Sequence, residues 1–345
     1  MKVLFDHSIP FRFAHGGLQV QIERTKEALG SLGVEVDWFR WWEPRQGGDL
    51  IHFWSVAGTG YLQAAQQAGI PVVMTTPFSA TCNRPVTRLR LQGAVVQSVL
   101  KLPFARTVIG QLSWPAFNLC ARNVVGLEIE RQVLEIVYAV PPARISTVPL
   151  GLSDTYLTAG PGRRTESHLI CVGTIVEWKN SVGLAGYAKA AKVPVLFVGK
   201  PYRESDPYWL KFKSLVDDRL VKYHPHVDSE VEMVRLLQAA RGFVLFSSYE
   251  NWCLAAHEAA ACGLPLLLPD QKWARERFGD DALYLAPPPG DLSNVQRLRS
   301  FYDQAPQLPA PKIRLFSWRE VAGELMGIYE AILKACGRPP GAVRQ

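Results

Sequence analysis

The chain has 345 residues, of which 48% are hydrophobic and 20% charged, and its formal net charge is +7. At about 100–200 residues per domain, this length predicts two domains. The composition excludes a disordered, collagen-like or coiled-coil chain. The sequence contains no run of 18 apolar residues, so we expect no membrane span. The first six residues predict a strand rather than a signal peptide, so we expect a cytoplasmic protein.

Charge is distributed unevenly along the chain. No acidic residue occurs between Asp49 and Glu128, whereas this stretch contains several basic residues, namely Arg84, Arg88, Arg90, Lys101, Arg106 and Arg122. A stretch of one sign presents positive potential and favours an anionic partner. Nucleic acid, anionic lipid and a phosphorylated substrate all fit this description.

The first half alternates short apolar runs with amphipathic stretches. The runs predict strands over residues 2–5, 34–39, 50–54, 71–75 and 145–148. Helices are expected over 18–32 and 61–68, and in pieces over 86–121 that break at Pro103 and Pro115. This alternation is typical of an α/β fold with a parallel sheet.

The alternation restarts after a segment that reads as a linker, residues 160–164. Strands are predicted over 168–172, 193–198, 220–223, 242–246, 264–268 and 283–285, with helices over 181–191, 207–216, 230–240, 254–262 and 292–301. We therefore expect two Rossmann-like domains facing across a cleft, over residues 1–158 and 165–315. A final amphipathic helix is predicted over 317–335, within a C-terminal segment 316–336.

The first candidate binding element is the Gly16-Gly17 pair, between the first strand and the first helix. Glycines let the backbone approach a ligand, and helix N–H groups favour an anion. A Gly-Gly turn alone is more often only a turn. No G-x-G-x-x-G follows, which disfavours a dehydrogenase.

The second candidate is Lys179, just after the first strand of the second half. A lysine at the carboxyl end of such a strand suits a diphosphate. Considered alone, Lys179 would more simply be a solvated surface lysine.

The strongest feature is the segment that contains Glu250 and Glu258, which leads from an apolar strand into an Ala-rich helix. Eight helical residues span roughly 12 Å, about the length of a sugar, a diphosphate and a ribose. The N–H groups of Trp252, Cys253 and Leu254 lie between the two carboxylates, where a diphosphate can bind the helix terminus. Either glutamate alone could be a cap or a surface residue.

These motifs together resemble a retaining glycosyltransferase of family 4, with the GT-B fold. The resemblance covers nearly the whole chain: a Gly-Gly loop, a Val-Gly strand followed by Lys179-Asn180, and a Glu-x7-Glu signature before an Ala-rich helix and Gly-x-Pro. Segments 148–151, 198–200 and 317–318 also have counterparts in the family.

The resemblance implies a role for each matching residue. Gly16 and Gly17 would approach the diphosphate and sugar, and Lys179 would neutralise the diphosphate. Glu250 would bind sugar hydroxyls and Glu258 the ribose. The backbone around Val227 would read the base.

Three departures from the family pattern concern the donor. Pro77 follows the strand after which the family often has a sugar-contacting histidine; His52 and Thr76 are the candidates to contact sugar or acceptor instead, although a structural role for His52 is equally consistent. Thr174 and Trp178 occupy the positions where a second basic residue is common. The Gly-Phe-Gly of the glutamate loop is Asn251-Trp252-Cys253.

The resemblance implies transfer of a hexose-like sugar from a UDP- or GDP-linked donor to a glycan, lipid-linked or small-molecule acceptor, with retention. Two alternatives remain: a GT-B sugar-nucleotide epimerase and a non-catalytic GT-B binding protein. No Asp-x-Asp occurs and the six cysteines form no C-x-x-C, so no cofactor or essential metal is expected. No nucleic-acid motif accompanies the basic stretch.

The basic stretch allows three interpretations. Arg84, Arg88 and Arg90 precede or lie among apolar residues at helical spacing, which suits an anionic membrane surface. They also suit a negatively charged acceptor, or a merely solvated helix face. The first interpretation predicts a cytoplasmic protein in peripheral contact with the inner membrane surface.

Overall fold

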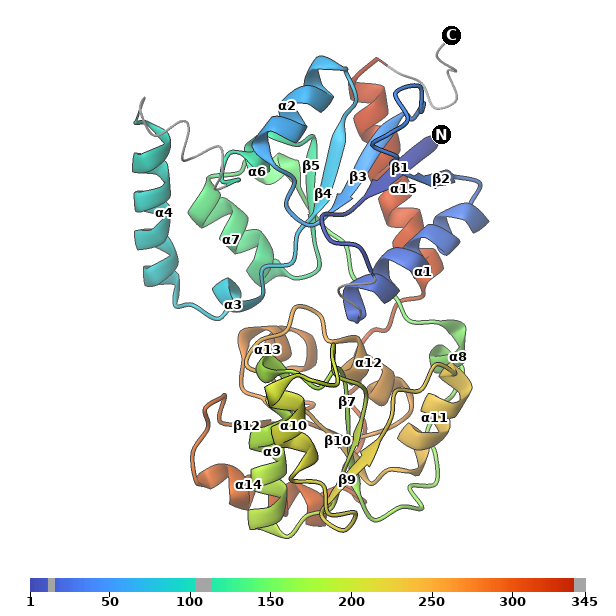
Figure 1. Ribbon diagram of the computed structural model, residues 1–345, viewed down its shortest axis with the longest axis vertical. Helices are drawn as coiled ribbons and strands as arrows, with labels where there is room; N and C mark the ends of the chain where they lie inside the picture. The colour runs from blue at the N-terminus through green and yellow to red at the C-terminus, as the bar shows by residue number, and fades with distance from the viewer. Residues whose placement is uncertain (12–15, 103–112, 338–345) are drawn as a thin grey trace. The chain divides into compact units, whose positions relative to one another are not determined.

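The computed structural model describes residues 1–11, 16–102 and 113–337. Residue contacts divide the chain into two compact units. Among the described residues, the first unit contains 1–11, 18–102, 113–151 and 318–337, and the second contains 16–17 and 152–317. Each unit is built around its own parallel six-stranded sheet (Figure 1).

The first sheet has the strand order β2-β1-β3-β4-β5-β6. Its strands are β1 (Lys2–Asp6), β2 (Glu35–Trp38), β3 (Leu50–Trp54), β4 (Val72–Thr75), β5 (Arg122–Val125) and β6 (Ile145–Thr147). Strands β3 and β4 are buried along their whole length, as expected for the centre of a parallel sheet.

Seven α-helices of the described residues belong to the first unit: α1 (Gly17–Ser31), α2 (Thr59–Gln67), α3 (Ser79–Cys82), α4 (Val86–Leu100), α6 (Ala116–Leu119), α7 (Glu128–Tyr138) and α15 (Trp318–Ala335). Helix α4 packs on α7 so closely that a Cβ on Gly93 would lie 2.3 Å from the carbonyl oxygen of Ile136. A 3-10 turn (Pro142–Arg144) precedes β6.

The second sheet has the order β12-β11-β10-β7-β8-β9. Its strands are β7 (Leu169–Val172), β8 (Val195–Val198), β9 (Val221–His224), β10 (Gly242–Val244), β11 (Leu266–Pro269) and β12 (Leu283–Leu285). The helices of this unit are α8 (Asp154–Leu157), α9 (Ser181–Ala191), α10 (Pro207–Lys213), α11 (Glu230–Ala239), α12 (Leu254–Ala261), α13 (Lys272–Phe278) and α14 (Ser293–Gln304). Helices α9, α10 and α14 pack side by side (Figure 1).

Some predicted elements differ from the structure. Strand β5 and helix α7 lie between the helical pieces predicted over 86–121 and the strand predicted over 145–148, where no element was predicted, and α13 was not predicted either. The predicted break at Pro103 lies outside the described residues. Segment 160–164 lies inside the second unit rather than at its boundary: Arg164 donates to the carbonyl oxygens of Gly263 and Ala305, both at 2.7 Å, and so satisfies acceptors beyond the ends of α12 and α14.

The predicted last helix forms as α15 and belongs to the first unit, although the preceding residues belong to the second. Its Tyr329 is buried, and the hydroxyl lies 2.5 Å from Nδ1 of His52 on β3. The C-terminal helix thus completes the core of the first unit.

Candidate active site

The strand order of the second sheet creates a switch point between β7 and β10. From β7 the chain proceeds outward through β8 and β9, and it then returns to the other side of β7 with β10. Ligands of such sheets bind beyond the carboxyl ends of the strands at the switch point. We call this place, formed by the segments that follow β7 and β10, the switch edge.

Lys179 and Glu250 meet at the switch edge. Lys179 ends a 3-10 turn (Glu177–Lys179) after β7, and its Nζ lies 2.5 Å from Oε1 of Glu250, which follows β10. The N–H of Ser248 also donates to the carbonyl of Trp178, at 2.6 Å, and so joins the same two segments. The structure therefore brings together the two residues to which the sequence assigned the central roles.

Both side chains of this ion pair are largely buried. Burial acts to lower the pKa of Lys179, but the neighbouring Glu250 outweighs it, so the pKa is raised. Lys179 consequently keeps its proton at neutral pH. In this structure its charge is balanced by Glu250, and an anionic ligand would have to compete for it.

The segment of residues 250–253, which we call the acidic loop, leads into α12. The carbonyl of Cys253 accepts from the N–H of Ala256 at 3.1 Å, as the cap of the helix. The N–H groups of Leu254 and Ala255, in the first turn, have no acceptor within the helix and make its terminus favourable for an anion. Burial raises the pKa of the Cys253 thiol well above its ordinary value, so this thiol is not a nucleophile at neutral pH.

Glu258 lies on α12, one turn after the helix begins, and residues 250–253 are not helical, so the predicted span of eight helical residues between the two glutamates does not form. Burial raises the pKa of its carboxyl to about 7, with a smaller contribution from the negative charge of Glu230 on α11. Glu230 itself accepts a hydrogen bond of 2.7 Å from Ser153 Oγ. A carboxyl group with this pKa is poised to exchange a proton near neutral pH, as groups at binding sites often are.

Val227 follows β9 at the same edge of the sheet, and its side chain is buried. Only its backbone could therefore contact a base, which is the role that the family resemblance implies for it. The role of Val227 stays a prediction. Among the described residues, no group of three or more histidine, cysteine, aspartate or glutamate side chains is placed to hold a metal ion.

The remaining predicted contacts come from the first half of the chain. Gly16 and Gly17 stand at the start of α1, and Gly16 has a φ of 138°, a conformation that requires glycine. Thr76 is buried, with its hydroxyl 3.3 Å from the carbonyl oxygen of Ser55. The roles of the two glycines stay predictions.

The structure places His52 in the core, where a substrate does not reach it. The imidazole is fully buried and stacks on Trp54, with ring centroids 4.1 Å apart. Nδ1 bonds to Tyr329 and Nε2 lies 2.7 Å from Thr75 Oγ1, so both nitrogens are engaged. Of the two interpretations of His52, the structural one fits this arrangement.

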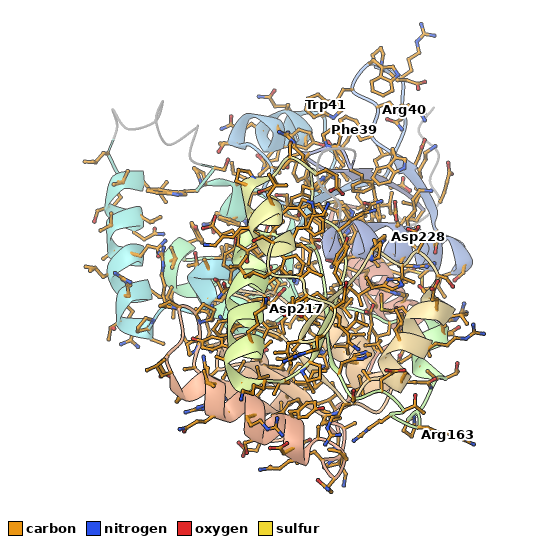
Figure 2. All side chains as sticks on the ribbon, turned by 60° about the horizontal axis from the view of Figure 1, so that its bottom comes forward. Phe39, Arg40, Trp41, Arg163, Asp217 and Asp228 are labelled. Atoms are coloured by element: carbon orange, nitrogen blue, oxygen red, sulfur yellow. The ribbon has the colours of Figure 1, made fainter. Side chains whose placement is uncertain are left out.

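Sequence reasoning missed a buried carboxylate at the switch point of the first sheet. Asp6 ends β1 and accepts hydrogen bonds from Tyr61 Oη at 2.8 Å and from Trp41 Nε1 at 3.3 Å. Burial raises its pKa despite these hydrogen bonds. Trp41 lies beside Phe39 and Arg40 in the loop after β2 and is 72% exposed (Figure 2). The signal was an acidic residue at the end of an otherwise apolar first strand.

Comparison with known proteins agrees with this architecture. Residues 166–301 match the family described as glycosyl transferases group 1. The chain is 25% identical over 211 residues to the O-antigen chain mannosyltransferase B of Escherichia coli, covering 56% of this chain and 52% of the relative. It is 26% identical over 312 residues to the MMP alpha-(1->4)-mannosyltransferase of Mycolicibacterium hassiacum, covering 82% and 70%. The chain thus spans about half the length of the first relative.

A solved structure shares the fold. HepE of Anabaena, determined in complex with UDP and glucose, superposes with a TM-score of 0.62 at 13% identity, covering 97% of this chain and 99% of HepE. At this identity the likeness establishes the fold alone. With its two parallel sheets, the chain has the GT-B fold, and residues 166–301 of its second unit resemble the group 1 glycosyl transferases.

Proposed function

We propose that this protein transfers a hexose-like sugar from a nucleoside diphosphate donor to an acceptor hydroxyl, with retention of the anomeric configuration. The observation that carries the proposal is the meeting of Lys179 and Glu250 at the switch edge, next to the start of α12. The mannosyltransferase relatives and the UDP and glucose bound by HepE support a nucleotide-sugar donor.

The ion pair has a defined part in donor binding. A diphosphate that reaches the switch edge draws the Lys179 ammonium away from Glu250, since two or more negative charges attract it more strongly than one. Glu250 then has its carboxylate free to accept hydrogen bonds from sugar hydroxyls. One exchange of partners thus couples recognition of the diphosphate to recognition of the sugar.

The rest of the donor extends along α12. The N–H groups at the helix start bind phosphate oxygens. Glu258 accepts hydrogen bonds from the ribose hydroxyls, and desolvation by the ligand is tolerable because its carboxyl is half protonated near pH 7. The backbone at Val227 contacts the base.

The chemistry needs positive charge where the diphosphate leaves. As the bond between the anomeric carbon and the phosphate oxygen breaks, negative charge develops on the diphosphate, and Lys179 and the helix N–H groups stabilise it. The acceptor oxygen attacks from the same face and gives its proton to the departing phosphate oxygen. This front-face reaction retains the configuration and requires no protein nucleophile.

We also propose that α4 contacts an anionic membrane surface, where a lipid-linked acceptor would reside. Its buried face, including Leu89 and Val96, packs in the first unit, whereas Leu91 and Val95 are 68% and 53% exposed. Exposed apolar side chains beside arginines favour an interfacial position. No helix in the described parts of the chain is long and apolar enough to cross a membrane.

The proposed function is tested by thermal unfolding with a panel of nucleotide sugars, beginning with GDP-mannose and UDP-glucose. A ligand that binds only the folded state raises the melting temperature. The best donor is then incubated alone and with candidate acceptors, and NMR identifies the sugar and its anomer. Transfer with retention supports the proposal. Inversion contradicts the mechanism, an epimerised donor favours an epimerase, and binding without turnover favours a binding protein.

A further inference from the structure

The acidic loop enters α12 through a left-handed residue that is not glycine. Cys253 has φ 60° and ψ 73°, and its side chain is buried. Residues with a Cβ rarely adopt this conformation, and it persists only where the surroundings impose it. The structure shows which contacts do so.

His257, one turn further along α12, holds the carbonyl of Cys253. Its Nδ1 lies 3.0 Å from Cys253 O, and its Nε2 lies 3.3 Å from Nε of Arg277 on α13. A guanidinium can only donate, so Nε2 is the acceptor and the proton is on Nδ1, which donates to Cys253. Burial lowers the pKa of His257 to about 3, which keeps the ring neutral.

The same two residues hold the neighbouring side chain of the loop. The Trp252 ring stacks on His257, with centroids 4.9 Å apart and planes 12° apart, and the Arg277 guanidinium carbon lies 4.1 Å from the Trp252 centroid. Trp252 is 3% exposed, and its indole nitrogen has no hydrogen-bond partner among the residues described. The position of the Trp252 ring is therefore set by its contacts with His257 and Arg277 and not by a hydrogen bond of its indole nitrogen.

We propose that His257, supported by Arg277, is a positioning residue for donor binding. It imposes the left-handed conformation at Cys253 and the placement of Trp252, and so directs Glu250 toward the sugar and the free N–H groups of α12 toward the diphosphate. This inference rests on the proposed function for its ligand. Without His257, Cys253 relaxes to an ordinary backbone conformation and the loop leaves its position.

The test compares three substitutions of His257. His257→Asn keeps an amide donor at the position of Nδ1, His257→Gln places its amide one bond further away, and His257→Phe keeps only the ring. The control is His168→Asn, a change of a buried histidine that directly precedes β7. Calorimetry measures the Kd of UDP, GDP and the best donor, well below each melting temperature.

We expect His257→Phe and His257→Gln to raise the donor Kd at least about fivefold. His257→Asn should raise it less, because it keeps the donor to Cys253 but loses the stack on Trp252, and His168→Asn should stay within about twofold. If His257 had only a structural role, its substitution would lower the melting temperature and leave the donor Kd equal to that of the wild type. Wild-type affinity in both the Phe and Gln variants would overturn the proposal.

A second readout does not depend on the ligand. Labelling of Cys253 by a thiol reagent, located by mass spectrometry, reports whether the loop has moved, and buried Cys171 is the internal reference. We expect Cys253 to react faster in His257→Phe and Cys171 to be unchanged. If the wild type binds no nucleotide but this difference appears, the proposed function fails and the positioning stands; equal protection of Cys253 in all variants refutes the positioning.

Discussion

We predict that the ionised carboxyl of Glu258, which the proposed function assigns to ribose binding, destabilises the folded protein. This carboxyl has a pKa of about 7 in the folded chain, against an ordinary value of 4.5. The folded state therefore holds the proton more tightly than the unfolded state does. The corresponding stability is present below pH 4.5 and is lost as the pH rises through 7. At about 1.36 kcal/mol per pH unit, the loss amounts to about 3 kcal/mol.

Glu258→Gln removes this titration and keeps the shape of the side chain. We expect the variant to resemble the wild type in urea unfolding at pH 4.5 and to exceed its free energy of unfolding by about 3 kcal/mol at pH 8. The control is Glu232→Gln on the exposed side of α11, which should stay within about 0.5 kcal/mol at both values.

Glu258→Gln should also weaken ligand binding. Because the amide replaces a carboxylate that accepts from the ribose hydroxyls, nucleoside diphosphate binding should fall at pH 8 while stability rises. A higher free energy of unfolding together with a weaker ligand affinity indicates a residue that serves binding and destabilises the folded state. An unchanged pH dependence of unfolding in Glu258→Gln would refute the reasoning.

Three further predictions concern other parts of the chain. Tyr329→Phe leaves Nδ1 of buried His52 unpaired and should lower the free energy of unfolding by about 1–3 kcal/mol with an unchanged donor Kd; equal stability would contradict the role of α15 in the core. Chelation with EDTA should leave transfer unchanged, whereas a loss restored by Mg²⁺ would show that a metal is required. Arg88→Ser with Arg90→Ser should reduce flotation with anionic vesicles and leave the low flotation with neutral vesicles unchanged; equal flotation on both lipids would leave only a solvated helix face.

Much of the fold could be predicted because parallel strands are buried on both faces. The run that became β8 is continuously apolar, short and rich in β-branched and aromatic residues, which favours a buried strand over a helix. Strand β5 was missed because it is four residues long and begins with Arg122 and Asn123. Its place between β4 and β6 follows from tertiary pairing, which local composition does not encode.

The candidate site was predictable only in part. The positions of Lys179 and Glu250 at strand ends followed from the alternation of strands and helices, and the parallel sheet then brought them together. The burial of His52 could not be foreseen, because it depends on α15, some 277 residues further along the chain. The hydrogen bond between His257 and the carbonyl of Cys253 could not be foreseen either, because a left-handed cysteine has no signature in the sequence.

The central claim is that Lys179 at the switch edge binds the diphosphate of a nucleotide sugar. Calorimetric titration of the best donor into the wild type and Lys179→Gln tests it most directly, with Lys189→Gln as the control, because Lys189 is also ion-paired, at 3.1 Å from Asp217. We predict that Lys179→Gln weakens donor binding at least about tenfold, since a hydrogen bond to a charged group contributes about 1.5–3 kcal/mol, whereas Lys189→Gln binds as the wild type does. Equal donor affinity in the wild type and Lys179→Gln would contradict the account.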